Sequence, residues 1–209
     1  MTSTSVFHDI LSAVSSALDT PVAVILVLLL AFAVFSIGWI LTEFFTEHRH
    51  LKECLPQLLD ELRAEPENRA ERISHSTLLA RQKEALLELT RHPAFTDTMR
   101  GSLAENLLAR EQAFYDLRLK RTDLAAKLAP MFGLLGTLIP LGPGIIALGG
   151  GDTYTLSVSL RTAFDTTIAG LVVAAVCLVI STVRRRWYRA YMADLETLTD
   201  CVLDLEAGK

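Results

Sequence analysis

The sequence predicts an all-α polytopic membrane protein with three transmembrane helices and a long cytoplasmic helical insert after the first. Hydrophobic residues make up 51% of the 209 positions. Residues 1–43 contain no Lys or Arg and residues 128–183 contain one, whereas 14 of the 20 Lys and Arg lie in residues 44–127. Three apolar stretches reach the roughly 20 residues that a helix needs to cross a hydrocarbon core. Charge concentrated between apolar blocks is typical of a membrane protein.

The first apolar stretch predicts an external segment over residues 1–20 and a transmembrane helix over residues 21–43. Ala31, Phe32 and Ala33 resemble a signal-peptide cleavage site, but no basic residue precedes the apolar run. The run also continues past that point, which a cleaved signal peptide does not do. We therefore expect the first span to be retained.

Residues 44–127 form the cytoplasmic insert, whose 14 basic and 14 acidic residues leave it neutral. Prolines divide it, and we expect one helix over residues 76–91 and a second from about residue 96. The second helix should continue without a break through the second span, residues 128–149. Its apolar residues are spaced by three, four and seven, as on one helical face: Leu103, Leu107, Phe114, Leu117, Leu124 and Leu128.

That stripe has two interpretations. It can fold back on helices of its own chain, or it can bundle neighbouring subunits. The absence of four regular heptads favours folding within the chain.

A short external loop over residues 150–157 should lead into the third span, residues 158–183, and a cytoplasmic C-terminal helix, residues 184–209. Basic residues follow the first and third spans, whereas Asp9 and Asp19 are the only charges before residue 22. Because basic residues gather on the cytoplasmic side, we expect the N-terminus outside the cell (inner) membrane and the C-terminus in the cytoplasm.

Several function classes lack their motifs. No hydrolytic triad or carboxylate pair occurs, and the glycines at 149–151 lack the lysine and hydroxyl of a phosphate-binding loop. The three cysteines and five histidines are too scattered for a disulfide framework or a metal site. The balanced charge argues against nucleic-acid binding, and the basic run 184–186 suits contact with membrane lipid. We predict a non-enzymatic protein without cofactor or metal, driven by an ion gradient.

Small residues line one face of each of the last two spans. Backbones that approach closely in lipid favour such residues, so these faces predict helix packing. The residues expected to pack are Gly133, Gly136, Ala163, Gly170 and Ala174.

Threonines accompany these small residues at Thr137, Thr166 and Thr167. A single threonine in a span usually bonds back to a carbonyl of the preceding turn. Threonines on the small-residue faces of consecutive spans favour a narrow polar ion pathway. From the helical rise, Thr137 lies about 15 Å from Lys127 and Thr167 about 25 Å from Arg184, which leaves their relative depth open.

The sequences APMFGLLGT at 129–137, ALGGGDTYTL at 147–156 and AFDTTIAGL at 163–171 resemble the MotA/TolQ/ExbB proton channel family. The last is similar to the family's A-L-x-x-T-x-x-G-L element. Three spans place the resemblance closer to the ExbB and TolQ branch.

The resemblance implies a homo-oligomer, a pentamer, around two helices of an ExbD/TolR/MotB-like single-span subunit whose membrane aspartate carries the proton. Carried over by position, Thr137 and Thr167 line the lumen. The resemblance also implies a function, that of a proton-conducting stator subunit of an ion-gradient-driven motor. Such a motor transduces the energy of the gradient into movement of the partner subunit and into work such as protein transport. The sequence leaves the choice between protons and sodium open.

The chain departs from the family pattern at one point. Many members have an acidic residue just before the A-L element, where this chain has Arg161 and Thr162, and an acid appears one turn later as Asp165. A charge inside a span needs protein or water around it. Asp165 is either a proton relay or a partner of Arg161. At 100° per residue it lies about 160° from Thr167 and about 40° from Arg161, which favours the ion pair or a subunit contact.

Two other functions remain as alternatives. A non-conducting membrane scaffold would recruit a partner through the cytoplasmic helices and would tolerate apolar replacements of the threonines. A substrate transporter fits the sequence less well, because three spans offer little room for a substrate site at the membrane midplane and show no internal repeat.

Overall fold

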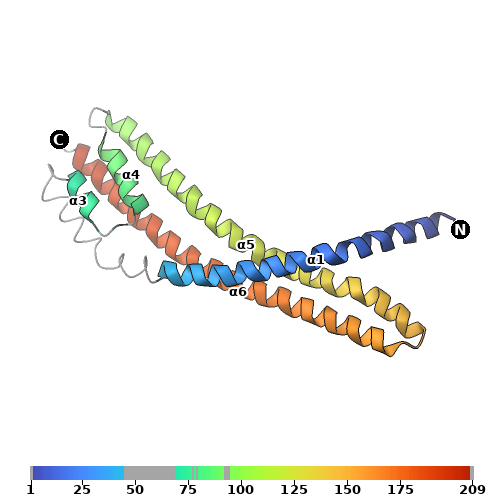
Figure 1. The fold of residues 1–209 in the computed structure, drawn as a ribbon. Helices are drawn as coiled ribbons and strands as arrows, with labels where there is room; N and C mark the ends of the chain where they lie inside the picture. Colours follow the sequence, from blue (N-terminus) through green and yellow to red (C-terminus); the bar gives the residue numbers. More distant parts are fainter. Residues whose placement is uncertain (1, 45–68, 77, 79, 92–94, 208–209) are drawn as a thin grey trace. The chain divides into compact units, whose positions relative to one another are not determined.

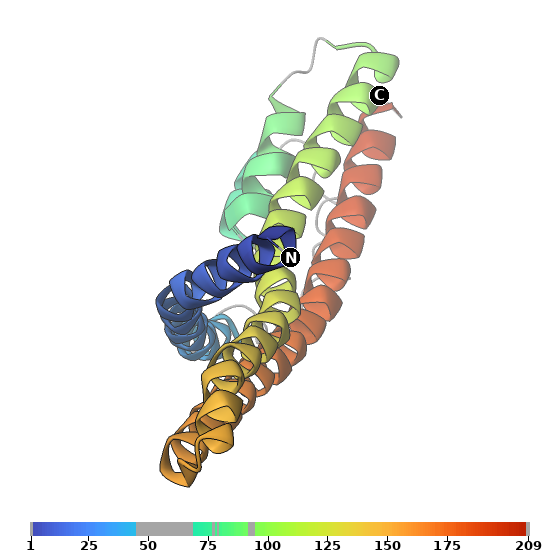
Figure 2. The same ribbon diagram turned by 90° about the vertical axis from the view of Figure 1, so that its right-hand side faces the viewer.

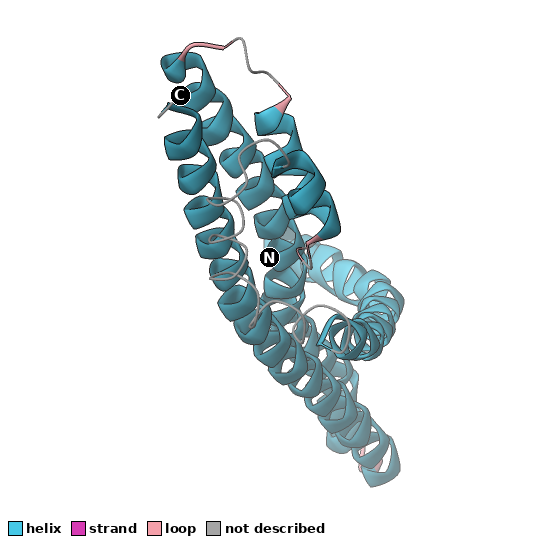
Figure 3. Ribbon diagram, turned by 90° about the vertical axis from the view of Figure 1, so that its left-hand side faces the viewer, coloured by secondary structure: helices cyan, strands magenta, loops and turns pink. Residues whose placement is uncertain are grey.

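The computed structural model describes residues 2–44, 69–76, 78, 80–91 and 95–207 of the chain. Within these ranges every regular element is a helix and no strand occurs (Figure 3). The helices are α1 (Thr2–Glu43), α3 (Arg69–His75), α4 (Ala80–Thr90), α5 (Asp97–Gly149) and α6 (Thr153–Ala207) (Figure 1). Three of them, α1, α5 and α6, are long and apolar enough to cross a membrane. The predicted all-α polytopic fold is confirmed.

The expected continuous helix of the insert and the second span is α5, with 53 residues. Its charged half is rich in Leu, Ala, Arg, Lys and Glu, which have high helix propensity, and Asp97 in the first turn complements the helix dipole. Helix α6, with 55 residues, likewise joins the third apolar stretch to the C-terminal segment. Both long helices therefore carry an apolar half and a charged half.

The chain divides into two compact units, and each is described by itself. The apolar unit comprises residues 1–38 and 121–181, and the charged unit comprises residues 39–120 and 182–209.

In the apolar unit, parts of α1, α5 and α6 share a core of small and medium residues. Along α1 the buried positions Val22, Leu26, Ala33 and Ser36 are separated by three, four or seven residues, which places them on one face. Large apolar side chains on the other faces are exposed, as lipid contact requires. The core cluster consists of Ala33, Ala125, Ala129, Val173 and Cys177.

A tight turn joins α5 to α6 in this unit. The amide of Asp152 donates to the carbonyl of Ala147 at 3.0 Å, and the amide of Gly151 donates to the carbonyl of Leu148 at 2.9 Å. These two bonds form a Schellman cap, which needs a left-handed residue at its end, and Gly151 has φ +83°. Asp152 then caps α6, because its carboxylate accepts a hydrogen bond from the Thr155 amide at 3.0 Å.

The turn is shorter than the loop expected over residues 150–157. Only residues 150–152 separate the two helices, because α6 begins at Thr153. The helix cap of α5 and the helix cap of α6 follow each other directly, so that no free loop remains between them.

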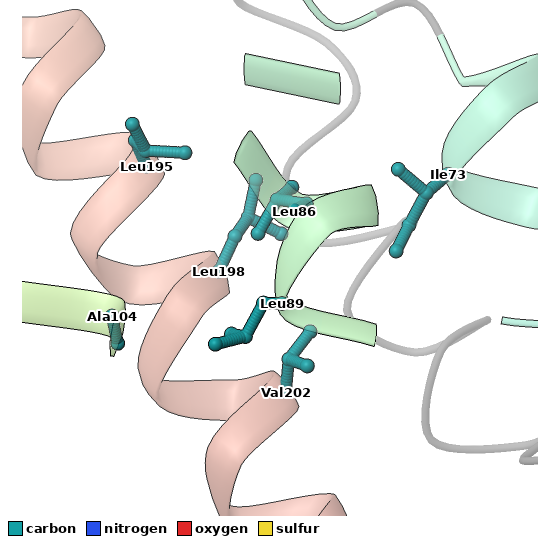
Figure 4. Packing of buried hydrophobic residues seen from close by; sticks show 7 residues of the cluster. All are labelled: Ile73, Leu86, Leu89, Ala104, Leu195, Leu198 and Val202. Carbon is teal, nitrogen blue, oxygen red and sulfur yellow. The ribbon is translucent and has the colours of Figure 1, made fainter. Parts of the chain in front are cut away.

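The charged unit packs α3 and α4 against the charged halves of α5 and α6. Leu86 and Leu89 of α4 lie with Ile73 of α3 and three residues of α6 in one cluster (Figure 4). Helix α4 runs beside α5 in this unit (Figure 2). The cluster is completed by Ala104, Leu195, Leu198 and Val202.

Polar contacts fix the position of α4 in the charged unit. The guanidinium of Arg81 donates two hydrogen bonds to Glu111 of α5, at 2.9 and 2.8 Å, and lies 3.6 Å from the ring centroid of Phe114. The buried amide of Gln82 donates to the backbone carbonyl of Tyr191 of α6 at 3.0 Å. Bidentate and buried bonds of this kind specify orientation as well as contact.

The helix expected over residues 76–91 was predicted too long, because α4 begins at Ala80. The amide and the hydroxyl of Ser76 both donate to the carbonyl of Ile73, so Ser76 closes the end of α3. Serine competes in this way with helix hydrogen bonds. The prolines that were expected to divide the insert, Pro56, Pro66 and Pro93, lie outside the described residues, as does Cys54.

The apolar stripe predicted along α5 is only partly used within the chain. Leu103 and Leu107 pack against the α4 cluster, and Phe114 packs against an aromatic cluster. Leu117 and Leu124 are 59% and 57% exposed, respectively. These two leucines do not pack within the single chain, so for them the choice between the two interpretations of the stripe stays a prediction.

Candidate functional site

A close contact between α5 and α6 in the apolar unit is built on three glycines. A Cβ atom added to Gly170 of α6 would lie 2.6 Å from the carbonyl oxygen of Ala129, and one added to Gly136 would lie 2.8 Å from the Cβ of Thr166. A Cβ added to Gly133 would lie 3.3 Å from the Thr166 carbonyl oxygen and 3.6 Å from the Thr167 Cα. The backbones of α5 and α6 therefore touch at the level of the threonines, as small residues permit.

The predicted packing residues all lie in or next to this contact. Gly133, Gly136 and Gly170 are buried, Ala163 is buried, and Ala174 packs against the small-residue core. We name this contact between α5 and α6 the glycine seam.

A polar pair crosses between the two helices at the other end of the seam. The hydroxyl of Ser181 on α6 donates a hydrogen bond to the Oδ1 carboxylate oxygen of Asp123 on α5. Ser181 is buried and Asp123 is half-buried. Both residues belong to the apolar unit, so the bond fixes the register of the antiparallel helices.

This register places the threonines at one level. Thr137 is 14 residues from Asp123 along α5, and Thr167 is 14 residues from Ser181 along α6. At 1.5 Å per residue each threonine lies about 21 Å from the pair, on the same side of it. The question of depth that the sequence left open is thereby answered: Thr137 and Thr167 are level.

All three threonine hydroxyls bond back to their own helix. Thr137 Oγ1 donates to the Leu134 carbonyl at 2.7 Å, and Thr166 and Thr167 Oγ1 both donate to the Ala163 carbonyl, at 2.9 and 3.1 Å. A hydroxyl that donates its proton still has lone pairs that accept. The three side chains are half-buried in the single chain. They therefore present acceptor oxygens at one level of the membrane-length helices.

Arg161 and Asp165 are placed together by one helical turn of α6. Arg161 Nε lies 3.9 Å from Asp165 Oδ2, and the two side chains are 87% and 70% exposed. This is the geometry expected if the two form an ion pair. At such exposure the contact alone contributes little to stability, because surface pairs are worth about 0–1 kcal/mol. Whether Asp165 is a structural or a relay group stays a prediction.

The charged unit contains a second buried polar cluster that the sequence did not reveal. Arg184 Nε donates to Glu43 Oε2 at 3.1 Å, and Tyr188 Oη donates to Glu43 Oε1 at 2.8 Å. Burial, reinforced by the negative Glu43, raises the pKa of Tyr188 well above its ordinary value and keeps the phenol a neutral donor. Arg184, expected to lie at the membrane surface with its basic neighbours, is instead buried in an ion pair.

Sequence patterns gave a weak signal for these missed residues. Glu43 ends the first apolar run and Arg184 ends the third, so each is the first charge after its span. Nothing in the spacing identified Asp123 or Ser181 as partners, because they are 58 residues apart. Among the described residues no group of three His, Cys, Asp or Glu side chains gathers in a way that suits a metal ion.

The family comparison covers most of the elements that form these sites. Residues 69–197 match the model of the MotA/TolQ/ExbB proton channel family, which is more than half of the chain. Neither a curated protein nor a solved structure matches the chain. With three membrane-length helices, the chain is a multi-pass membrane protein. It belongs to the MotA/TolQ/ExbB proton channel family.

Proposed function

We propose that this chain is the proton-conducting stator subunit of an ion-gradient-driven motor, which couples proton flow to movement of a single-span partner subunit. The observation that carries the proposal is the level position of Thr137 and Thr167 beside the glycine seam. Two neighbouring helices offer hydroxyl oxygens at one depth, where a proton carried by a partner's carboxyl group could be received. A level ring of such oxygens forms when several copies surround one axis.

The proposals of a partner subunit and of a homo-oligomer both rest on side chains that the single chain leaves partly or fully exposed. In the single chain the threonines are half-buried beside the contact of two helices, and a pathway lined on every side would need further helices. Leu117 and Leu124, exposed on the part of α5 that lies outside the expected span, are better covered by another copy than by water. We propose a homo-pentamer that surrounds two helices of a partner of the ExbD/TolR/MotB kind, whose membrane aspartate carries the proton.

The orientation belongs to this proposal as well. The basic residues that follow α1's apolar run and the third span favour a cytoplasmic location of the charged unit, since basic segments stay on that side. The turn at residues 150–152 then lies outside, in a cell or inner membrane. The glycine seam has its threonines toward the outer half and Asp123 at the cytoplasmic end.

The experiment compares hydroxyl removal with hydroxyl retention. Thr137→Val and Thr167→Val keep the side-chain volume but remove the acceptor oxygen, whereas Thr137→Ser and Thr167→Ser keep it. The chain is purified with its single-span partner, reconstituted into vesicles and exposed to a pH gradient, with a pH-sensitive dye inside. We expect the valine variants to assemble normally and to conduct poorly, and the serine variants to conduct.

Two outcomes would contradict the proposal. Full proton flux in the double valine variant would remove the threonines from the pathway. Absence of flux in the unmodified complex, together with recruitment of a partner by residues 44–127 alone, would support the scaffold instead.

A further inference from the structure

Pro140 lies inside helix α5, in the segment that carries the glycine seam. Proline has no amide hydrogen, so the helical bond that residue 140 would donate to the carbonyl of Gly136 cannot form. In a membrane-spanning helix such a freed carbonyl needs a donor from protein or water, because lipid tails supply none. The Gly136 carbonyl is therefore an acceptor without its regular helical donor, at the level of the threonines.

This carbonyl lies on the side of α5 that contacts α6. Gly136 and Pro140 are about 40° apart in rotation, and the Gly136 carbonyl points along the helix toward position 140. A Cβ added to Gly136 would lie 2.8 Å from Thr166 Cβ and 2.9 Å from Thr166 Oγ1, so the Thr166 side chain covers this glycine. An acceptor on α5 and a hydroxyl on α6 thus lie beside one another across the glycine seam.

The Thr166 hydroxyl donates to a carbonyl that has more donors than it needs. Thr166 Oγ1 and Thr167 Oγ1 both donate to the Ala163 carbonyl, at 2.9 and 3.1 Å. The backbone amide of Thr167 is the regular helical donor to the same oxygen. A carbonyl oxygen has two lone pairs, so one of the three donors can turn away and leave the oxygen satisfied. Thr166 is the donor whose side chain lies against Gly136 and can turn toward α5.

We propose that the Gly136 carbonyl oxygen and the Thr166 hydroxyl bind a water molecule that carries the moving proton as hydronium. The carbonyl accepts a hydrogen bond from this water, and the hydroxyl donates to it or accepts from it. Thr166 is half-buried, so water reaches it from the open side of the seam. Pro140 is a positioning residue in this step, because it keeps the carbonyl available. The inference rests on the proposed conduction.

The carbonyl also favours the charged form of this water. The negative end of a carbonyl dipole stabilises a cation, as carbonyl oxygens do in ion-selective channels. Hydronium is therefore bound more tightly than neutral water. It then gives one proton to the next water of the pathway and is left as water, and no covalent bond of the protein changes.

A second proline of α5 provides the matched control. Pro143 also lies inside the helix and removes the regular donor of the Ile139 carbonyl. Three residues turn a helix by about 300°, so this carbonyl points about 60° away from that of Gly136 and lies about 4.5 Å farther along. Pro143 is exposed, whereas Pro140 is half-buried. The two prolines change the helix in the same way but free different carbonyls.

The test gives each carbonyl its donor back. Pro140→Ala restores an amide that can donate to Gly136, and Pro143→Ala does the same for Ile139. Both changes favour the helix, so neither is expected to unfold it. Proton flux is measured in vesicles that contain the complex with the single-span partner, and the amount of assembled complex is measured by size-exclusion chromatography.

We expect Pro140→Ala to assemble and to lose proton flux about ten-fold, the effect of one lost hydrogen bond to the moving ion. Pro143→Ala should conduct like the unmodified complex. Unchanged flux in Pro140→Ala would overturn the inference. An equal loss in both variants would overturn it as well, because a straighter helix and not the lost acceptor would then be the cause.

Variants of Thr166 decide the matter if Pro140→Ala does not assemble. Thr166→Val removes the hydroxyl at nearly equal volume, whereas Thr166→Ser keeps it. A higher flux in the serine variant would support the inference, and equal flux in the two would overturn it.

A combined variant tests whether the two groups hold the same water. In Pro140→Ala with Thr166→Val the two losses of flux should not add, because either change alone removes the site. Losses that multiply would overturn the inference and leave the pathway through Thr137 and Thr167 in place. An unmodified complex that carries no protons would instead contradict the proposed function itself.

Discussion

Arg184 and Glu43 form a buried ion pair in the charged unit, with an Nε–Oε2 distance of 3.1 Å and side-chain exposures of 8% and 3%. The second carboxylate oxygen of Glu43 accepts a hydrogen bond from the hydroxyl of Tyr188. The pair joins the last turn of α1 to α6, at residues that follow directly on their apolar runs. Both oxygens of a buried carboxylate are thus satisfied, as its desolvation requires.

Removing the charge of Glu43 should destabilise the charged unit strongly. Glu43→Gln leaves the Arg184 guanidinium buried without a counter-charge, which typically costs about 3–5 kcal/mol. The thermal midpoint of the purified protein in detergent should fall, and Glu105→Gln, an exposed change on α5, should leave it unchanged. An unchanged midpoint in Glu43→Gln would show that water reaches the pair.

Tyr188→Phe removes the hydrogen bond of the phenol to Glu43 from the same cluster. The phenol donates to a charged acceptor at 2.8 Å, and bonds of this type contribute about 1.5–3 kcal/mol. We expect a smaller fall of the thermal midpoint than in Glu43→Gln. In the double variant the effects should not add, because both changes act on the same carboxylate.

A side chain at Gly170 should force the two hairpin helices apart. The added Cβ of Gly170→Ala would lie 2.6 Å from the Ala129 carbonyl oxygen, which is backbone and cannot rotate away. Overpacking of this kind typically costs about 1–3 kcal/mol. Gly101→Ala on α5 meets nothing within 4 Å, so it should be neutral or stabilising through helix propensity. A comparison of thermal midpoints checks both, and equal midpoints would mean that the seam is loosely packed.

The sequence was sufficient for the fold but not for the register of the site. The length of the apolar stretches and the segregation of charge predicted the three long helices. The helical spacing of apolar residues, which continues from the insert into the second span, predicted the continuity of α5. The relative depth of Thr137 and Thr167 depends on where the hairpin turns. The third span was predicted to begin at residue 158, whereas α6 begins at Thr153. Five residues correspond to about 7.5 Å along a helix, and a displacement of that size would place Thr137 and Thr167 at different depths.

Contacts between distant segments also lay beyond the sequence patterns. Helical periodicity gives the face of a helix but not its partner, so Ser181 could be assigned to a small-residue face without any indication that it meets Asp123. The same limit applies to Arg184, which is buried although the basic residues that follow it, Arg185 and Arg186, are exposed. The periodicity of the sequence showed that these residues lie on helices, whereas only the three-dimensional packing identified their partners.

Asp165→Asn should distinguish the two roles of that carboxylate. The pair with Arg161 is exposed within one chain, so its loss should not change the thermal midpoint of the isolated subunit. If Asp165 is structural in the assembly, the variant yields less complex on size-exclusion chromatography, and the complex that forms still conducts. A fully assembled complex without proton flux would assign Asp165 to the relay.

The turn between α5 and α6 should become less stable in acid because of Asp152. Hydrogen bonds from the hydroxyl and the amide of Thr155 hold the pKa of Asp152 below its ordinary value of 3.8. A lowered folded-state pKa means that the cap stabilises the turn fully above pH 3.8 and that this contribution is lost as the pH falls through the lower value. Hydrogen exchange of the amides of residues 153–156 should therefore gain protection on going from strong acid to pH 5.

Asp152→Asn provides the comparison for this effect. The asparagine oxygen can accept the Thr155 amide bond at every pH, and asparagine is as good a helix cap as aspartate. The acid-dependent loss of protection should therefore disappear in this variant. Asp204→Asn, an exposed change far along α6, should retain it. The same acid-dependent loss in both variants would show that another carboxylate, and not Asp152, governs the turn.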